Sequence, residues 1–297
     1  MIEVKELQKS FDGFAALRGL HIHVPKSAVY GLVGPNGAGK STVIRHLAGI
    51  YRQDGGEVLI GGQPVYENPA VKEKIAYIPD DIFYFGAASL RDMKNLCRAM
   101  IPTFSDARFE KLREAFPLDE RRAMRRLSKG MQKQAAFWIA LSCCPTVILL
   151  DEPVDGLDQV MRRQVWSLLL QDVAERGTTV LVSSHNLREL EDVCDHVGIM
   201  DKGRMLLERP LAALQENTVK IQLALPDGKE LPDGLDVLHE SRTGRLRQLI
   251  LRGSSGELTA RLAACEPFFM DVLPLSLEEI FIYELGGEDH EIKNILL

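Results

Sequence analysis

Three segments of the chain are continuous apolar runs: residues 28–33 (AVYGLV), 146–150 (TVILL) and 178–184 (TTVLVSS). Short apolar runs bounded by turn residues are typical of parallel strands that are covered on both faces. The first run leads into a glycine-rich loop. Apolar residues then recur at helical spacing, at Val43, Ile44, Leu47 and Ile50. The pattern therefore predicts a strand, a loop and a helix in that order.

Weaker patterns predict the rest of the first two thirds of the chain. Residues 2–11 and 20–24 alternate and are predicted as edge strands, and residues 74–79 (KIAYIP) as a further strand. Residues from about 81 to 145 are predicted to be mostly helical, forming a helical subdomain, and residues 197–207 to form a hairpin. Alternating strands and helices of this kind predict an α/β fold.

The character of the sequence changes near residues 214–218. Beyond that point apolar residues alternate, which indicates a half-exposed strand. Further strands are predicted at about 246–251 and 268–273, with helices at about 256–264 and 276–285. We therefore expect a first domain over 1–214 and a small α+β domain over 218–297.

Composition limits the class of protein. At 297 residues the chain suits two domains, and its 45% hydrophobic and 26% charged residues are typical of a globular protein. From Thr218 onward there are 8 Lys and Arg against 14 Asp and Glu, so this part carries the whole net charge of −6. Neither part has the basic excess of a nucleic-acid binder.

Other classes are disfavoured by what the chain does not carry. No apolar run approaches the ~18 residues of a membrane-spanning helix, and the N-terminus does not have the pattern of an export signal. The five cysteines show no paired metal-binding spacing, and their odd number argues against a disulfide framework. These features favour a cytosolic protein with reduced thiols.

The loop GPNGAGKST carries the strongest chemical signal. It fits the pattern G-x-x-x-x-G-K-[ST] and lies between a predicted strand and a predicted helix, as a phosphate-binding loop must. Its glycines let backbone N–H groups turn toward phosphate oxygens, and the following helix directs its positive end at the same place. The predicted nucleotide-binding residues are Gly34, Pro35, Asn36, Gly37, Ala38, Gly39, Lys40, Ser41 and Thr42.

Two side chains of this loop have specific expected roles. Lys40 can reach the β- and γ-phosphates of a nucleoside triphosphate, and the Ser41 hydroxyl can ligate Mg²⁺. Asp151 and Glu152 follow the apolar run at 146–150, so their carboxylates lie where parallel sheets bind ligands. We expect Asp151 to hold Mg²⁺ and Glu152 to polarise the attacking water as a base.

Between these two sites lies LSKGM (127–131), and DGLD (155–158) and SSH (183–185) follow them. With the phosphate loop and VILLDEP, these motifs occur in the order found in the ATP-binding subunits of ABC transporters, and residues 1 to about 210 resemble that family. The resemblance implies an ABC-type P-loop ATPase core. That core has a mixed or parallel sheet, a helical subdomain and an antiparallel β subdomain.

The resemblance also implies further site residues. The signature residues Ser128, Lys129, Gly130 and Met131 would contact the ATP held by a partner subunit, because a hydroxyl and free N–H groups at a helix start form an anion site. His185 would contact the γ-phosphate, and Asp158 would contact the partner. Phe11 stands where the family stacks an aromatic ring on adenine; an ordinary core phenylalanine is the alternative.

The sequence departs from the family pattern in two places, one after the strand at 74–79 and one in the signature. Asp80 stands where the family usually has a Gln that senses Mg²⁺ and the membrane partner, and Lys129 and Met131 replace Gly and Gln in the signature. An aspartate can ligate Mg²⁺ directly or through water, but it cannot donate a hydrogen bond when ionised. Ser128 and Gly130 keep the family pattern, so we expect the signature to work.

As a whole, the resemblance implies an ATPase with ATP and Mg²⁺ as cofactors. It would form a homodimer or heterodimer around two ATP molecules and power export by a separate transmembrane permease. The chain would then lie on the cytoplasmic face of the membrane, and no nucleic acid is expected. A soluble ABC-type ATPase acting on ribosomes or DNA is the alternative. Residues 273–287 resemble the tail of bacterial export subunits, although a packed core helix also explains them.

Overall fold

The computed structural model describes residues 1–279 except 83, 86, 212, 214–217, 227–228 and 277. Most of the helix predicted at 276–285, and the expected boundary at 214–217, lie outside the described residues. The chain forms two compact units. One comprises Met1–His185 with Val193–Glu208, and the other Asn186–Asp192 with Arg209–Leu297.

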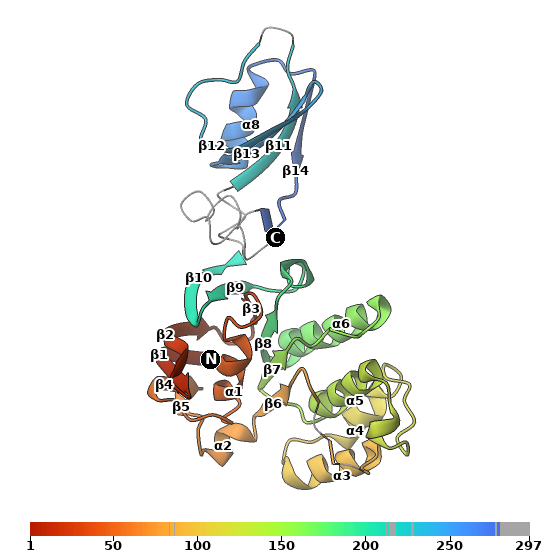
Figure 1. The fold of residues 1–297 in the computed structure, drawn as a ribbon. Coiled ribbons are helices and arrows are strands. Elements are labelled where there is room, and N and C mark those ends of the chain that lie inside the picture. The colour runs from red at the N-terminus through yellow and green to blue at the C-terminus, as the bar shows by residue number, and fades with distance from the viewer. Residues whose placement is uncertain are drawn as a thin grey trace. The chain divides into compact units, whose positions relative to one another are not determined.

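A six-stranded sheet is the centre of the first unit, with strand order β10-β9-β3-β8-β7-β6 (Figure 1). Its strands are β3 (Val29–Val33), β6 (Ile75–Ile78), β7 (Val147–Asp151), β8 (Thr179–Ser184), β9 (His196–Asp201) and β10 (Arg204–Pro210). The pairs from β9 through β3, β8 and β7 to β6 are all parallel. Every residue of β3, β7 and β8 is buried, as the three continuous apolar runs predict.

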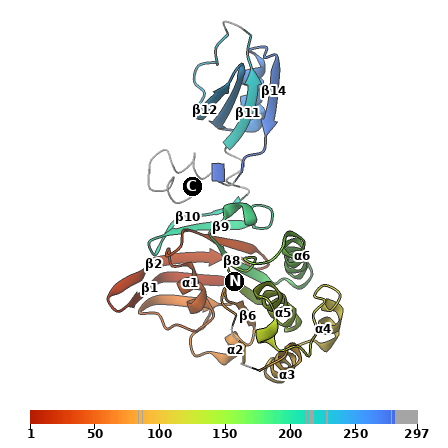
Figure 2. The same cartoon turned by 45° about the vertical axis from the view of Figure 1, so that its right-hand side comes forward.

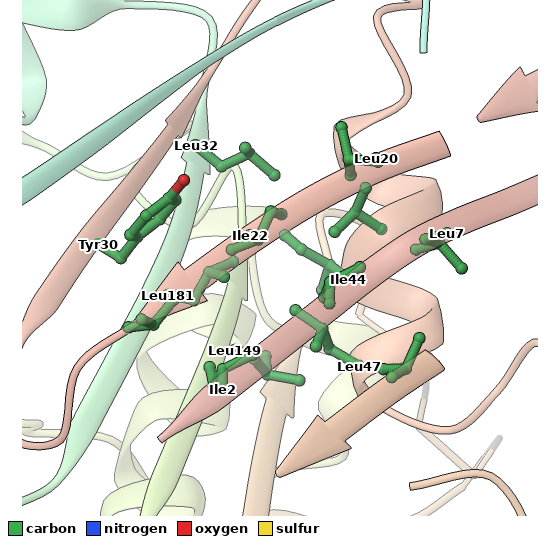
Figure 3. Packing of buried hydrophobic residues seen from close by; sticks show 14 of the residues in the cluster. Ile2, Leu7, Leu20, Ile22, Tyr30, Leu32, Ile44, Leu47, Leu149 and Leu181 are labelled. Carbon is green, nitrogen blue, oxygen red and sulfur yellow. The ribbon is translucent and has the colours of Figure 1, made fainter. Parts of the chain in front are cut away.

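A second, antiparallel sheet has the order β2-β1-β4-β5. Its strands are β1 (Ile2–Phe11), β2 (Phe14–Val24), β4 (Gly55–Ile60) and β5 (Gln63–Pro64). Helix α1 (Lys40–Leu47) packs between the two sheets, and Figure 3 shows its Ile44 and Leu47 beside Ile2 of β1 and Leu149 of β7. This shared core fixes α1, and the loop that precedes it, against the central sheet.

The remaining helices of this unit are α2 (Pro69–Lys72), α3 (Leu90–Met100), α4 (Asp106–Leu112), the 3-10 helix η1 (Met124–Arg126), α5 (Lys129–Ser142) and α6 (Gln159–Arg176). Helices α3, α4 and α5 gather into one helical layer beside β6 (Figures 1 and 2). The predicted helical stretch at 81–145 therefore exists, broken into separate helices. No helix among the described residues is long and apolar enough to cross a bilayer.

The second unit contains a four-stranded antiparallel sheet, ordered β12-β13-β11-β14, and the short 3-10 helix η2 (Leu187–Glu189). The strands are β11 (Thr218–Ala224), β12 (Val237–Thr243), β13 (Leu246–Arg252) and β14 (Phe269–Leu273). Helix α8 (Ser255–Ala263) covers one face of this sheet (Figure 1). Its Leu258 and Leu262 join Ile221 and Leu249 in a hydrophobic core of this unit. The predicted small α+β arrangement is thus present; β12 was not predicted.

Candidate nucleotide site

The loop between β3 and α1 has a backbone that only glycine tolerates at key points. A Cβ on Gly34 would lie 2.2 Å from the backbone oxygen of Met200 in β9. The start of the loop therefore packs directly against the backbone of β9. Gly37 and Gly39 have φ values of 85° and 105°, in the left-handed region. Gly39 is the N-cap of α1, which places the free N–H groups of the first helical turn next to the loop.

Lys40 begins α1 and turns its side chain back over the loop. Its ammonium donates to the carbonyl oxygen of Gly34 at 2.6 Å and lies 3.5 Å from Oε1 of Glu152. Lys40 is 5% exposed, so the charge is held in place by these partners. The loop borders a cavity of about 400 Å³, lined by Phe11, Phe14, Ala16, Asp80, Glu152 and loop residues 35–42.

Asp151 lies at the end of β7 and is 2% exposed. The hydroxyls of Ser41 and Ser183 both donate to its Oδ1, at 3.0 Å and 2.7 Å. The carboxylate therefore joins the first turn of α1 to the end of β8. Burial, together with the charge of Asp151, raises the pKa of Tyr77 in the adjacent strand β6.

Glu152 takes a left-handed backbone conformation, with φ at 45°, which is uncommon for a residue with a Cβ. Its Oε2 lies 3.0 Å from Nδ1 of His185, and its backbone N–H donates to Oγ of Ser183 at 3.2 Å. With Lys40 at Oε1, both carboxylate oxygens have a partner. The structure thus brings together Lys40, Glu152 and His185, which the motifs had marked separately.

Asp80 borders the same cavity, and it forms an ion pair with a residue that the motifs did not mark. Its Oδ1 lies 3.4 Å from Nζ of Lys133 in α5, and the same ammonium donates to the backbone oxygen of Glu152 at 2.6 Å. The predicted magnesium residues Ser41 and Asp151 are in direct contact. Asp80 lines the same cavity as Ser41.

Ser128 is the N-cap of α5, and its Oγ accepts a hydrogen bond from the backbone N–H of Met131 at 3.2 Å. Gly130 lies against Gly156, since a Cβ would be 2.7 Å from that backbone oxygen. Asp158 caps α6 in the same manner. None of Ser128 to Met131, nor Asp158, lines the cavity at the phosphate loop. Lys129 instead borders a second cavity, of about 520 Å³, together with Asp80 and Lys133.

Phe11 lies at the rim of the loop cavity and is 37% exposed, so it is not an ordinary core residue. Its ring meets the edge of Tyr51 with centroids 5.3 Å apart. Phe14 lines the same cavity and is 66% exposed. The two rings give the cavity an apolar rim on which a planar base can stack.

Sequence reasoning missed several residues of this site. Ser183 donates to the carboxylate of Asp151, and Lys133 donates to the backbone oxygen of Glu152. Ligand atoms of Glu152, Asp155 and His185 all lie within 4.8 Å of one another. Asp155 and Ser183 stand inside quoted motifs and could have been singled out by position. Nothing in the sequence near Lys133 indicates its partners, because they come from two other segments.

Comparisons with known proteins agree with this geometry. A family model described as "ABC transporter" matches residues 17–155. The ABC transporter ATP-binding protein YtrB of Bacillus subtilis (strain 168) is 31% identical over 291 residues, covering 97% of this chain and 99% of that protein. The chain belongs to the ATP-binding proteins of ABC transporters. It is therefore an ATPase subunit, as the motifs predicted.

Relatives with named roles and solved structures support the same family. The daunorubicin/doxorubicin resistance ATP-binding protein DrrA of Streptomyces peucetius is 33% identical over 223 residues, which is 73% of this chain and 67% of that protein. A solved ATP-binding subunit of an ABC transporter, 26% identical, superposes with a TM-score of 0.68 over 72% of this chain and 92% of its own. A dimeric ATP-binding cassette bound to ADP and Pi, 20% identical over 71% of this chain and 99% of its own, shares the fold with a TM-score of 0.64.

Proposed function

We propose that two such subunits, identical or related, close around two ATP molecules and power export through a separate membrane permease. One observation above all supports the proposal. Ser41 contacts Asp151, and Lys40 and His185 each contact Glu152, at a single edge of the central sheet. A cation for phosphate, oxygen ligands for a metal and a carboxylate for water are the groups that phosphoryl transfer needs.

In the proposed reaction Glu152 is the general base. It takes a proton from the water whose oxygen attacks the γ-phosphorus, and the bond from that phosphorus to the bridging oxygen breaks, giving ADP and phosphate. His185, 3.0 Å from the carboxylate, would orient this water and contact the γ-phosphate. Lys40 and the backbone N–H groups of the loop would hold the β- and γ-phosphates.

The residues present fit a magnesium ion. Mg²⁺ binds few protein oxygens and keeps several waters. The carboxylate of Asp151 and the hydroxyl of Ser41, 3.0 Å apart, supply such oxygens beside the loop. Asp80 would reach the ion through water, since one of its oxygens faces Lys133. When bound, the ion neutralises charge on the β- and γ-phosphates.

The partner's ATP would be contacted by residues that do not line this subunit's own cavity. Helix α5 begins with the signature: Ser128 is its N-cap, and Lys129, Gly130 and Met131 form its first turn. The free N–H groups of this turn suit an anion. We propose that this helix start faces the γ-phosphate bound by the other subunit. Asp158 would contact the partner near the same place.

The names of relatives support the proposal of export. One is the Nod factor export ATP-binding protein I of Paraburkholderia xenovorans (strain LB400), 31% identical over 260 residues, covering 80% of this chain and 81% of that protein. DrrA is named for drug resistance. We propose that this chain acts on the cytoplasmic face of the membrane through its permease. Residues 1–214 would then be the ATPase domain, and residues 218–297 an accessory domain that assists dimerisation or regulates the cycle.

The decisive experiment compares the parent with Glu152→Gln. The parent should hydrolyse ATP only with Mg²⁺, and Glu152→Gln should bind ATP, lose about 10²–10⁴-fold in kcat and form an ATP-dependent dimer in sedimentation. A Glu152→Gln variant that turns over at the parent rate contradicts the base assignment. A permease that co-purifies from detergent extract would support the transport role.

A further inference from the structure

Lys133 is a buried cation inside the ATPase unit that none of the family motifs explains. It lies in the second turn of α5 and is 4% exposed. An ammonium group removed from water needs charged or hydrogen-bonding partners to be tolerated. The ammonium of Lys133 donates to the backbone oxygen of Glu152 at 2.6 Å and lies 3.4 Å from Oδ1 of Asp80.

The contact with Glu152 supports an unfavourable backbone conformation. A non-glycine residue at φ 45° is energetically unfavourable and persists only where its surroundings hold it. Both backbone polar atoms of Glu152 are held: its N–H by Oγ of Ser183 at 3.2 Å and its oxygen by Lys133. The direction of the carboxylate, toward Lys40 and His185, follows from this backbone.

The contact with Asp80 connects this support to a second wall of the cavity. Asp80 follows β6 and borders the cavity at the phosphate loop, and its side chain is 59% exposed. A neutral glutamine at position 80 would remove this ion pair with the ammonium of Lys133. The aspartate at position 80 and the lysine at position 133 thus match each other in charge.

We propose that Lys133 is a positioning residue for ATP hydrolysis, which holds the main chain of Glu152 and links it to Asp80. Movement or charge change at Asp80 is then transmitted to the carboxylate of Glu152 through one ammonium group. The inference rests on the proposed function, because it takes Glu152 to be the base. It also gives the aspartate at position 80, where the family usually has glutamine, a role that does not depend on a metal.

The test measures kcat, KM for ATP and thermal stability of Lys133→Met, which keeps the length of the side chain and removes its charge. We expect kcat to fall about 10–100-fold, since a small misplacement of a reacting group has effects of this size. ATP affinity should change less than threefold, because Lys40 and the loop are untouched. Lys72→Met is the matched control: Lys72 is half-buried and donates to the backbone oxygen of Gly49 at 2.8 Å, outside the site. Lys72→Met should lower the thermal stability and leave kcat and KM unchanged.

A double-mutant cycle separates positioning from ordinary structural support. If Lys133 acts together with Asp80, the kcat of Asp80→Asn with Lys133→Met should be close to that of Lys133→Met alone. Losses that multiply independently would overturn the proposal. If the methionine variant fails to fold, Lys133→Gln replaces it, since glutamine keeps a donor to Glu152 and removes the charge that faces Asp80. If Lys133→Gln and Asp80→Asn both keep the parent kcat, the pair of Lys133 and Asp80 has no part in hydrolysis, and the proposal is overturned.

These outcomes are distinct from a failure of the proposed function. If Glu152→Gln hydrolyses ATP at the parent rate, the base assignment is wrong and Lys133 has nothing to position. If Glu152→Gln is inactive but Lys133→Met and Lys133→Gln turn over like the parent, the base assignment stands and only the role of Lys133 is rejected.

Discussion

Replacing Ser128 with alanine tests the proposed sandwich of ATP between two subunits. Its oxygen accepts the N–H of Met131 at 3.2 Å, which leaves the hydroxyl hydrogen available as a donor. The same side chain can therefore cap α5 and donate to a phosphate of the partner's ATP. Ser128→Ala should remove both interactions at once, and the two losses appear in different measurements.

The magnitudes follow from the two roles. Loss of a helix cap costs about 0.5–2 kcal/mol of folding stability per subunit. A hydrogen bond to a charged group contributes about 1.5–3 kcal/mol, and a symmetric dimer has two such sites, so about 3–6 kcal/mol of dimer stability is at risk. At about 1.4 kcal/mol for each factor of ten, the ATP-dependent dimer should dissociate about 10²–10⁴-fold more readily.

The assay is sedimentation equilibrium with ATP and Mg²⁺ in a Glu152→Gln background, which prevents turnover. Ser105→Ala is the matched control, since Ser105 caps α4 by accepting the N–H of Arg108 at 3.2 Å and lies outside the proposed site. It should lose a similar amount of folding stability and leave the dimer unchanged. If Ser128→Ala dimerises within threefold of the background variant, the hydroxyl does not touch a phosphate and the sandwich reasoning fails.

Three further predictions concern the phosphate loop and its helix. Lys40→Ala should weaken ATP binding at least about 100-fold in calorimetry, because a charge-assisted phosphate contact is lost; unchanged affinity would reject the loop assignment. Gly34→Ala should lower the free energy of unfolding in urea by about 1–3 kcal/mol, since its Cβ would lie 2.2 Å from the backbone oxygen of Met200. Burial lowers the pKa of His46 in the folded state, so below pH about 6.5 the unfolded chain takes up a proton that the folded chain resists. Stability should therefore fall as pH drops through 6.5, and His46→Gln should show a smaller fall in melting temperature; equal slopes would contradict this.

The fold was predictable from sequence where burial is complete on both faces. The strands β3, β7 and β8 were found because parallel strands covered on both faces are continuous apolar runs. Helix α6 was missed because its buried side is not a clean apolar stripe: it includes Asp172, which pairs with Arg108 of α4, while the apolar Leu170 is exposed. Pairing between distant segments decides such positions, and a local pattern does not contain it.

The same distinction separates the predicted and missed parts of the site. The glycine loop and the carboxylates at the end of β7 are local: a strand, a turn and fixed residue types suffice to identify them. Lys133 gains its partners only when α5 lies beside Glu152, which follows β7, and Asp80, which lies two residues beyond β6. Family motifs gave no reason to expect a lysine there.

The register of the central sheet explains why these separate motifs meet. Leu149 pairs with Leu181 and Asp151 with Ser183 in the parallel ladder of β7 and β8. Because side chains alternate along a strand, Asp151 and Ser183 continue the face on which Leu149 and Leu181 pack against α1. That face ends at the first turn of α1, where Oγ of Ser41 lies 3.0 Å from Oδ1 of Asp151. A slip of one residue would turn the carboxylate away from the helix, so the apolar core that fixes the register also assembles the site.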